Sequence, residues 1–248
     1  MKRNNSSYNQ ILPYLDVRRE GRQITISPII TKFASKPKNK PMAKFIKLYN
    51  DHTDQILIDE VVETLRNGGL VIYPTDTVYG LGASIKSNKA IEKLAHLKGT
   101  KVDKANFTFL FSGLSHLSEY TKQIDTATFK ILKKAFPGPY TMILPANNNL
   151  PKIFKKRKTF GMRIPDNPIL LKIIEKLGHP IVNISIKDDD EVVEYTTDPE
   201  LINEKWGKLV DVIIDASYGD NNPSTVIDLT GDDPEVIREG KGDIDRLF

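Results

Sequence analysis

The chain of 248 residues contains no cysteine, and this absence excludes several kinds of protein. Without thiols there is no disulfide bond, no thiolate zinc site and no cysteine nucleophile. The sequence also lacks a run of eighteen apolar residues, which argues against a transmembrane helix. Its first residues lack the apolar core of a secretory signal. A cytoplasmic location is therefore the default prediction.

The usual catalytic signatures are missing as well. No glycine-rich loop ends in Gly-Lys-Ser or Gly-Lys-Thr, and Gly80 with Gly82 falls short of a dinucleotide-binding fingerprint. No nucleophile elbow or catalytic triad is visible. The four histidines are scattered without metal-ligand spacing, so we predict no metal site. These absences favour a reaction that depends on positioning and electrostatics, such as attack on a nucleotide phosphate.

Charge is distributed unevenly along the chain. Residues 1–41 hold nine Lys and Arg against Asp16 and Glu20, so this arm carries +7 within a total of +4, and the remainder carries −3. We interpret residues 1–41 as a flexible basic extension that ends in a Lys- and Pro-rich linker, and residues 42–248 as one folded domain. Two explanations of the extension stay open: Met42 is the native start, or the arm contacts RNA.

From residue 43 onward, strand-like and helix-like segments take turns, which predicts an α/β or α+β fold with a single twisted sheet and helices on its faces. We find no internal repeat and no second domain. Helices are expected over residues 56–65, from the cap Ser87 to 97, and from the cap Asp125 to about 135. A fourth helix is expected to be capped by Asp166 or Asn167, to have Pro168 in its first turn and to end at Gly178. Strands are expected over residues 43–49, 70–73, 107–111, 141–145, 159–164, 181–186, 210–215, 225–229 and 236–238.

The most informative segment is the turn that follows the apolar run 70–73. Pro74 ends the strand because it has no N–H to donate, and Thr75, Asp76 and Thr77 come directly after it. Two glycines, at 80 and 82, allow a close approach of the backbone. Ligands of open α/β sheets bind beyond the carboxyl ends of strands, so we expect chemistry at this turn.

Other polar residues stand at the ends of predicted elements, and each taken alone has an ordinary structural explanation. Lys98 could complement a helix dipole, Arg163 could form a structural ion pair, and Ser224 could be a turn residue. Together these residues supply only hydroxyls and cations. They are Lys98, Lys101, Lys104, Thr141, Arg163, Ser185, Ser224 and Arg238.

Taken together, these motifs resemble the YrdC/YciO family, which includes the threonylcarbamoyl-AMP synthases. The resemblance covers about residues 43–248 and rests on Pro74-Thr75-Asp76-Thr77-Val78-Tyr79-Gly80-Leu81-Gly82, Leu97-Lys98-Gly99, Phe136-Pro137-Gly138-Pro139-Tyr140-Thr141, Gly161-Met162-Arg163-Ile164-Pro165, Pro223-Ser224-Thr225-Val226-Ile227-Asp228 and Ile237-Arg238-Glu239-Gly240. The segments 106–109 and 156–163 are more similar to the YciO-type branch. The resemblance implies a twisted, concave sheet with a large, positively charged cavity.

The resemblance also implies a reaction. L-Threonine, bicarbonate and ATP, with Mg²⁺, would give threonylcarbamoyl-AMP and pyrophosphate for the threonylcarbamoyladenosine modification of tRNA. Cations would bring the repelling carbamate and phosphate together, and a walled cavity would protect the labile intermediate. By resemblance, the catalytic residues are Lys98 and Arg163, the substrate-binding residues are Thr77, Thr141 and Ser224, and the nucleotide-binding residues are Lys98, Lys104, Ser185 and Arg238.

Two departures from the family pattern argue against a fast synthase. The family's Lys-x-Arg motif is here Lys98-Gly99-Thr100, and a lysine such as Lys101 cannot reproduce a planar bidentate fork. The asparagine of the Ser-x-Asn motif is replaced by Lys187, which cannot accept a hydrogen bond. The alternative function is a double-stranded RNA- or tRNA-binding protein of the same fold. That alternative assigns phosphate contacts to Lys155, Lys156, Arg157 and Lys158, whose ordinary explanation is a solvated loop.

Overall fold

The computed structural model describes residues 41–49, 54–186 and 194–248, and Pro41–Phe248 form one compact unit. Except for Pro41, the predicted basic extension lies outside the described residues, as does Lys187. Within the described ranges, no helix combines the length and apolar character needed to cross a membrane.

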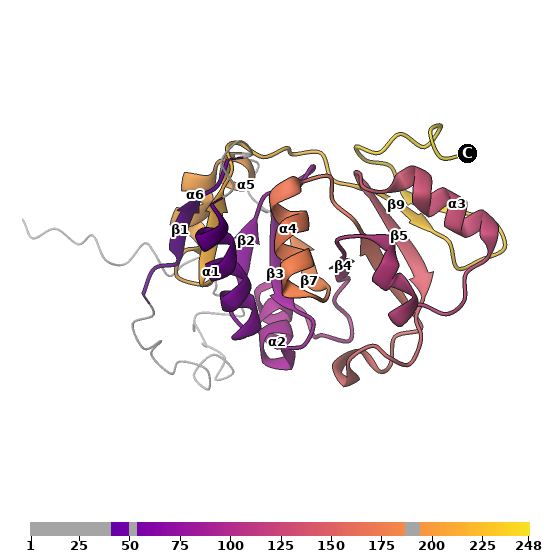
Figure 1. Ribbon diagram of the computed structural model, residues 1–248, viewed down its shortest axis with the longest axis horizontal. Helices are drawn as coiled ribbons and strands as arrows, with labels where there is room; N and C mark the ends of the chain where they lie inside the picture. Colours follow the sequence, from indigo (N-terminus) through magenta and orange to yellow (C-terminus); the bar gives the residue numbers. More distant parts are fainter. Residues whose placement is uncertain (1–40, 50–53, 187–193) are drawn as a thin grey trace, which may run out of the picture. The chain divides into compact units, whose positions relative to one another are not determined.

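Ten strands and several helices make up the described residues (Figure 1). The strands are β1 (Lys44–Lys47), β2 (Val71–Tyr73), β3 (Gly80–Ser84), β4 (Thr108–Leu110), β5 (Tyr140–Pro145), β6 (Thr159–Arg163), β7 (Ile181–Ser185), β8 (Val212–Asp215), β9 (Thr225–Asp228) and β10 (Glu235–Arg238). The α-helices are α1 (Gln55–Arg66), α2 (Asn88–Leu97), α3 (Thr126–Ala135), α4 (Pro168–Leu177), α5 (Glu194–Thr197) and α6 (Pro199–Trp206). Two 3₁₀ segments, η3 (Leu114–Glu119) and η4 (Lys152–Phe154), complete them.

All ten strands belong to one mixed sheet, in the order β1-β8-β2-β3-β7-β4-β6-β5-β9-β10. The sheet contains parallel pairs, such as β1 with β8 and β4 with β6, and antiparallel pairs, such as β3 with β7 and β5 with β6. The predicted fold class, a single twisted sheet flanked by helices, is confirmed. The sheet brings strands that are distant in the sequence side by side, which is how the site is assembled.

Two apolar cores lie on opposite faces of the sheet. Ile72 in β2 belongs to one core, while its neighbours Val71 and Tyr73 belong to the other. This alternation is expected because successive side chains of a strand point to opposite faces. The core that contains Tyr73 is formed with α1 and α4, which pack against each other in front of the sheet (Figure 1).

The helix caps that the sequence predicts are present. Ser87, Asp125 and Asn167 each accept a hydrogen bond from a backbone N–H of the first helical turn. Pro168 stands at the start of α4, where its missing N–H costs nothing, and Gly178 ends the helix with φ +77°.

One strand and several short helices were not expected from the sequence. Gly80 and Gly82, interpreted above as part of a turn, lie in β3. Glycine is rare inside strands, so propensity concealed this one. A Cβ atom at Gly82 would overlap the Tyr73 hydroxyl, so the missing side chain makes room for a neighbouring ring. The segments α5, α6, η3 and η4 were likewise not predicted.

Candidate active site

The sheet face that α1 and α4 cover becomes polar beyond β4. Leu110 in β4 belongs to the core beneath these helices and pairs with Arg163 in β6. Residues that pair directly across strands point to the same face, so Arg163 projects from that face too. Two residues back, Thr108 pairs with Gly161 on one side and Asn183 on the other. The sheet therefore presents small and polar residues where the helices no longer cover it.

Arg163 is the centre of this polar region. Its side chain is only 8% exposed, and Nη2 donates to Asp76 Oδ1 at 2.6 Å. Nη1 donates to Thr77 Oγ1 at 2.8 Å, and Thr77 is fully buried. Burial lowers the pKa of Arg163, while the adjacent Asp76 carboxylate raises that pKa again. A buried cation is tolerated here because a carboxylate pairs with it.

The turn that carries Asp76 and Thr77 is held by its own side chains and by the C-terminal segment. Thr75 Oγ1 accepts from the Thr77 N–H at 3.0 Å and donates to the Val78 carbonyl at 2.8 Å. Lys241 Nζ donates to the Asp76 carbonyl at 2.7 Å. The turn is thus fixed by its own threonine and by Lys241 of the C-terminal segment. Short polar side chains stabilise turns in this way because they bond nearby backbone groups.

A second polar group adjoins Arg163. Thr141 Oγ1 and Ser224 Oγ are 2.9 Å apart, and both residues are buried. Arg238 Nη2 donates to the Ser224 carbonyl at 2.7 Å, and both Thr141 and Arg238 pair with Val226 of β9. Burial is the main cause that lowers the pKa of Arg163, and the charge of Arg238 contributes further. Two guanidinium groups and two hydroxyls therefore share one region.

The structure thus brings together five of the predicted site residues, although they come from five separate segments of the chain. They are Thr77, Thr141, Arg163, Ser224 and Arg238.

Lys98, Ser185 and Lys104 are placed differently. Lys98 caps the C-terminus of α2, and its Nζ donates to the Asn106 carbonyl at 2.6 Å. Ser185 is exposed at the end of β7 and pairs with Gly80. Lys104 is also exposed, in the segment between α2 and β4.

These residues lie near the ends of the central strands β4 and β7, and we call this row of strand ends the sheet edge. Because Thr108 pairs with Asn183, continuing the antiparallel register of β4 and β7 places Asn106 across from Ser185. Arg163 pairs with Leu110, which is four residues after Asn106 along the chain. The Arg163 position is therefore about 13 Å from the Asn106 position along the strand direction. The candidate site therefore has a buried group around Arg163 and an exposed group at the sheet edge.

Two further residues of the polar face were not assigned from the sequence. Tyr73 Oη donates to Asn183 Oδ1 at 2.8 Å, and the ring lies against Gly80 and Gly82. Burial raises the pKa of Tyr73 well above its ordinary value, and the charge of Arg163 opposes this. An asparagine inside an apolar strand was the one signal in the sequence for this pair.

The sequence likewise indicates no role for Asp76, although this residue stands inside the most informative motif. An acidic residue beside two threonines in a turn is usually a turn residue. Its ion pair with Arg163 joins positions 87 residues apart, so nothing local in the sequence indicates it.

The basic run after η4 exposes only some of its side chains to solvent. Three of its residues are exposed, namely Lys155, Lys156 and Lys158. Arg157 is turned into the fold, where Nη2 donates to the carbonyls of Val102, at 2.9 Å, and Ala105. Its guanidinium also lies 5.4 Å from the centre of the Phe154 ring. Arg157 thus uses Nη2 within the fold, and its contact with phosphate stays a prediction.

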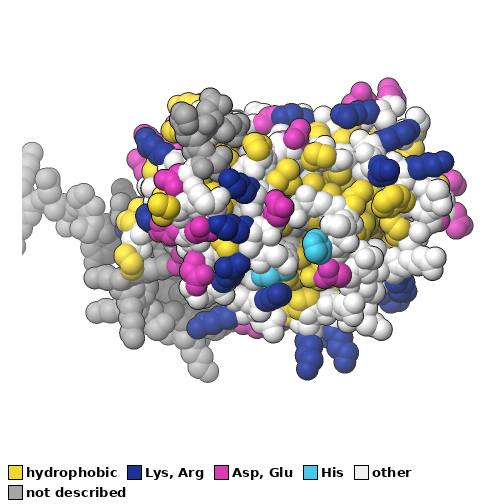
Figure 2. Space-filling model, viewed as in Figure 1, with side chains coloured by type: hydrophobic (Ala, Val, Ile, Leu, Met, Phe, Trp, Pro, Cys, Tyr) yellow, Lys and Arg dark blue, Asp and Glu magenta, His cyan; other side chains and the backbone are white. Residues whose placement is uncertain are grey.

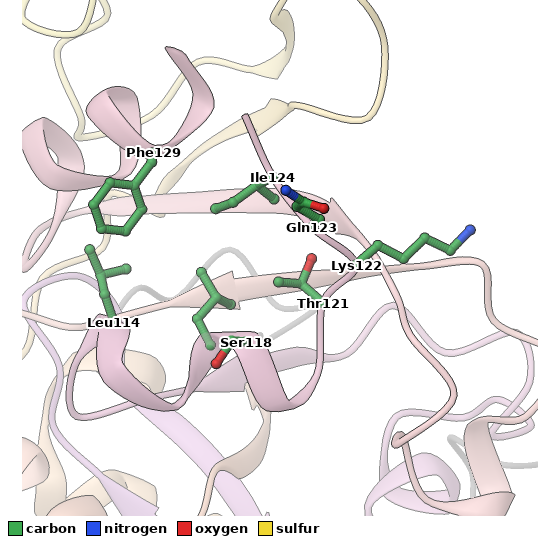
Figure 3. Close-up of a pocket in the computed structure, with 8 residues that line it drawn as sticks. Leu114, Ser118, Thr121, Lys122, Gln123, Ile124 and Phe129 are labelled. Carbon is green, nitrogen blue, oxygen red and sulfur yellow. The ribbon is translucent and has the colours of Figure 1, made fainter. Parts of the chain in front are cut away.

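Two cavities open elsewhere on the described residues. One of about 450 Å³ lies between η3, the segment 121–124 and α3, with Leu114 and Phe129 facing each other and Lys122 extending outward (Figure 3). The other, of about 390 Å³, includes Lys86 and Lys152 in its lining. Neither is lined by the Arg163 group. A cluster of three or more His, Asp or Glu residues suited to a metal ion is also absent from the described ranges.

Comparisons with known proteins agree with the motifs. A family model for Sua5, YciO and YrdC proteins, described as telomere recombination, matches residues 63–240. Escherichia coli YciO, described as uncharacterized, is 40% identical over 206 residues, 82% of this chain and 98% of that protein. A protein of Methanocaldococcus jannaschii described as a putative threonylcarbamoyl-AMP synthase is 32% identical over 82% of this chain and 96% of its own length.

Solved structures show the same relationship. The crystal structure of E. coli YciO superposes with a TM-score of 0.76 and covers 84% of this chain and 100% of that one. Pyrococcus abyssi Sua5, solved in complex with L-threonine, gives a TM-score of 0.70 at 27% identity, over 79% of this chain and 57% of that one. The match thus spans the whole of the YciO chain but little more than half of the longer Sua5 chain.

Proposed function

This chain belongs to the Sua5/YciO/YrdC family, and we propose that it is a nucleotidyltransferase that makes threonylcarbamoyl-AMP from L-threonine, bicarbonate and ATP. The product would serve the threonylcarbamoyladenosine modification of tRNA. Support comes from relatives of 28 to 32% identity named as threonylcarbamoyl-AMP synthases, one of them described as putative, and from the similarity to a Sua5 protein solved with L-threonine.

The observation that carries the proposal is the pair of guanidinium groups, Arg163 and Arg238, beside the hydroxyls of Thr77, Thr141 and Ser224. In the proposed reaction the threonine amine forms a bond to the bicarbonate carbon and water leaves, which gives a carbamate. A carbamate oxygen then attacks the α-phosphorus of ATP, the bond from that phosphorus to the bridging oxygen breaks, and pyrophosphate leaves. Both reactants are anions. Arg163 is buried and therefore has little water around it, whereas Arg238 is exposed at the end of β10. A fixed, buried cation stabilises the charge that develops between two such groups.

We assign the parts of the site by their chemistry. Arg163 and Arg238 would hold carboxylate or phosphate oxygens, and the three hydroxyls would orient the amino acid. Lys98, Lys104 and Ser185, at the sheet edge, would contact the nucleotide. With a single carboxylate at the Arg163 group, the donor set suits Mg²⁺ that arrives on the phosphates of ATP, and we treat MgATP as the substrate.

The decisive experiment is a pyrophosphate-release assay with purified full-length protein. Release should require ATP, L-threonine and bicarbonate together. Arg163→Lys, which keeps the charge but loses the fork, should lower kcat by about tenfold or more. Lys98→Ala should abolish the activity, because the protein would lose the cation that we assign to the phosphates or the carbamate. Release that ignores threonine or bicarbonate would reject the proposal.

RNA binding is the second candidate function. Three exposed lysines, Lys155, Lys156 and Lys158, follow one another closely after η4. On the face that Figure 2 shows, Lys and Arg side chains are spread among acidic and apolar ones. Replacing these three lysines with alanine should weaken tRNA binding and flatten its salt dependence by about three units of slope. Binding that does not change between low and moderate salt would count against this function.

A further inference from the structure

Asp76 occupies only half of the hydrogen-bonding fork that Arg163 offers. Its Oδ1 accepts from Nη2, but within the described residues its Oδ2 and the Nε of Arg163 are both buried without a hydrogen-bond partner. A carboxylate or phosphate ordinarily engages such a fork with two oxygens. Buried donors and acceptors without partners are costly and call for an explanation.

The backbone around this pair is fixed. Lys241 Nζ bonds the Asp76 carbonyl at 2.7 Å and Asp220 Oδ2 at 2.6 Å. The Asp220 N–H donates to the Thr77 carbonyl at 3.2 Å, and Arg163 is paired within the sheet through Leu110. A ligand that reaches Arg163 therefore finds a rigid frame, in which the Asp76 side chain is the part that can turn away.

We propose that Asp76 is a built-in competitor for the anion site of Arg163. An incoming group with two anionic oxygens takes Nε and Nη2 together and displaces the Asp76 carboxylate, while Thr77 keeps Nη1. A group that offers one oxygen gains too little to replace an internal ion pair. Asp76 thus acts as a specificity-determining residue that admits carboxylates and phosphates. The inference rests on the proposed function only because that reaction supplies such anions.

The sign of one measurement separates this role from a purely structural one. If Asp76 only positioned Arg163, its removal would loosen the guanidinium and weaken anion binding. If Asp76 competes, its removal must tighten anion binding. Asp76→Asn keeps the shape and one acceptor oxygen but removes the charge, so it tests the competition directly.

The experiment is calorimetric titration of full-length protein with inorganic pyrophosphate and, separately, with acetate, which tells phosphate from carboxylate recognition. Asp76→Asn should bind at least one of them about tenfold more tightly than the unchanged protein, since no internal charge has to be displaced. Asp220→Asn removes the same charge from the same cluster but leaves the Arg163 pair intact, and it should change affinity less than about threefold. Unchanged or weaker binding by Asp76→Asn, or equal effects of both variants, would overturn the proposal.

A second measurement observes the binding in the unchanged protein. In the unchanged protein, the side-chain Nε–H resonance of Arg163, identified by its loss in Arg163→Lys, should shift when pyrophosphate or acetate saturates the site. A resonance that stays in place at saturation overturns the proposal. A failed synthase assay would instead reject the proposed reaction and leave these binding results standing.

Discussion

One face of the sheet has two halves with opposite characters. Beneath α1 and α4 the strands present apolar side chains such as Val71, Ile181 and Leu110. Beyond β4 the same face presents Arg163 and Thr141 instead. The covered half holds the fold together, since apolar surface removed from water is its main source of stability. The half beyond these helices contains polar groups that bind one another, and we propose that they also bind the substrates.

The largest effect should follow removal of the central cation. Arg163→Met should cost about 3–5 kcal/mol of unfolding free energy, because it leaves the Asp76 carboxylate buried without its counter-charge. Urea denaturation would measure this. The double variant Asp76→Asn with Arg163→Met should recover part of the loss. Equal stability of the single and double variants would show that the pair is not what stabilises the polar half.

The covered half should respond through packing alone. Ile173 in α4 is fully buried, so Ile173→Ala should cost about 2–5 kcal/mol through lost contacts and a cavity. Ile56 at the start of α1 is 76% exposed, so Ile56→Ala should change stability by no more than about 0.5 kcal/mol. The same denaturation assay compares them. An Ile173→Ala protein that keeps full stability but loses pyrophosphate affinity would erase the distinction between the halves.

The hydroxyl pair should have a smaller and coupled effect. Ser224→Ala leaves the buried Thr141 hydroxyl without its partner at 2.9 Å, and should cost about 1–3 kcal/mol. Thr141→Val alone should cost a similar amount, and the two together less than their sum. A double-mutant cycle measures this coupling. Strictly additive losses would mean that the two hydroxyls do not interact in solution.

The smallest effect should come from the exposed ion pair behind the turn. In this pair, the hydrogen bond that Lys241 donates to Asp220 lowers the pKa of the Asp220 carboxyl below its ordinary value of 3.8. The pair is therefore stabilising above that pH, and this contribution is lost as the pH falls through the lowered pKa. Asp220→Asn should reduce stability at pH 7 by less than about 1 kcal/mol and flatten its acid dependence. Thermal unfolding between pH 2.5 and 7 would show this, and Asp232→Asn, on the exposed β9–β10 turn, is the control.

Local patterns in the sequence were sufficient for most elements. The caps Ser87, Asp125 and Asn167 and the stop at Gly178 act within a few residues of their own helix, so they can be read without the fold. The strand β3 was missed for a reason that is not local. Its glycines are required by the Tyr73 ring, which reaches across them from β2.

The candidate site shows the same division. Thr77, Thr141, Arg163, Ser224 and Arg238 were selected by motif, and the structure brings them together. The ion pair of Arg163 with Asp76 and the inward turn of Arg157 depend on segments dozens of residues apart, so no sequence window contains them.

The amino-acid sequence by itself determined where most helices and strands lie, which family the chain resembles, and which hydroxyls and cations could carry chemistry, because these follow from neighbours along the chain. Only the tertiary structure decided which of those groups meet, which are buried, and that Asp76 forms an ion pair with Arg163. The reason is physical: a charge acquires its partners and its exposure from the strands packed around it, and the sheet order that packs them is not written in any single segment.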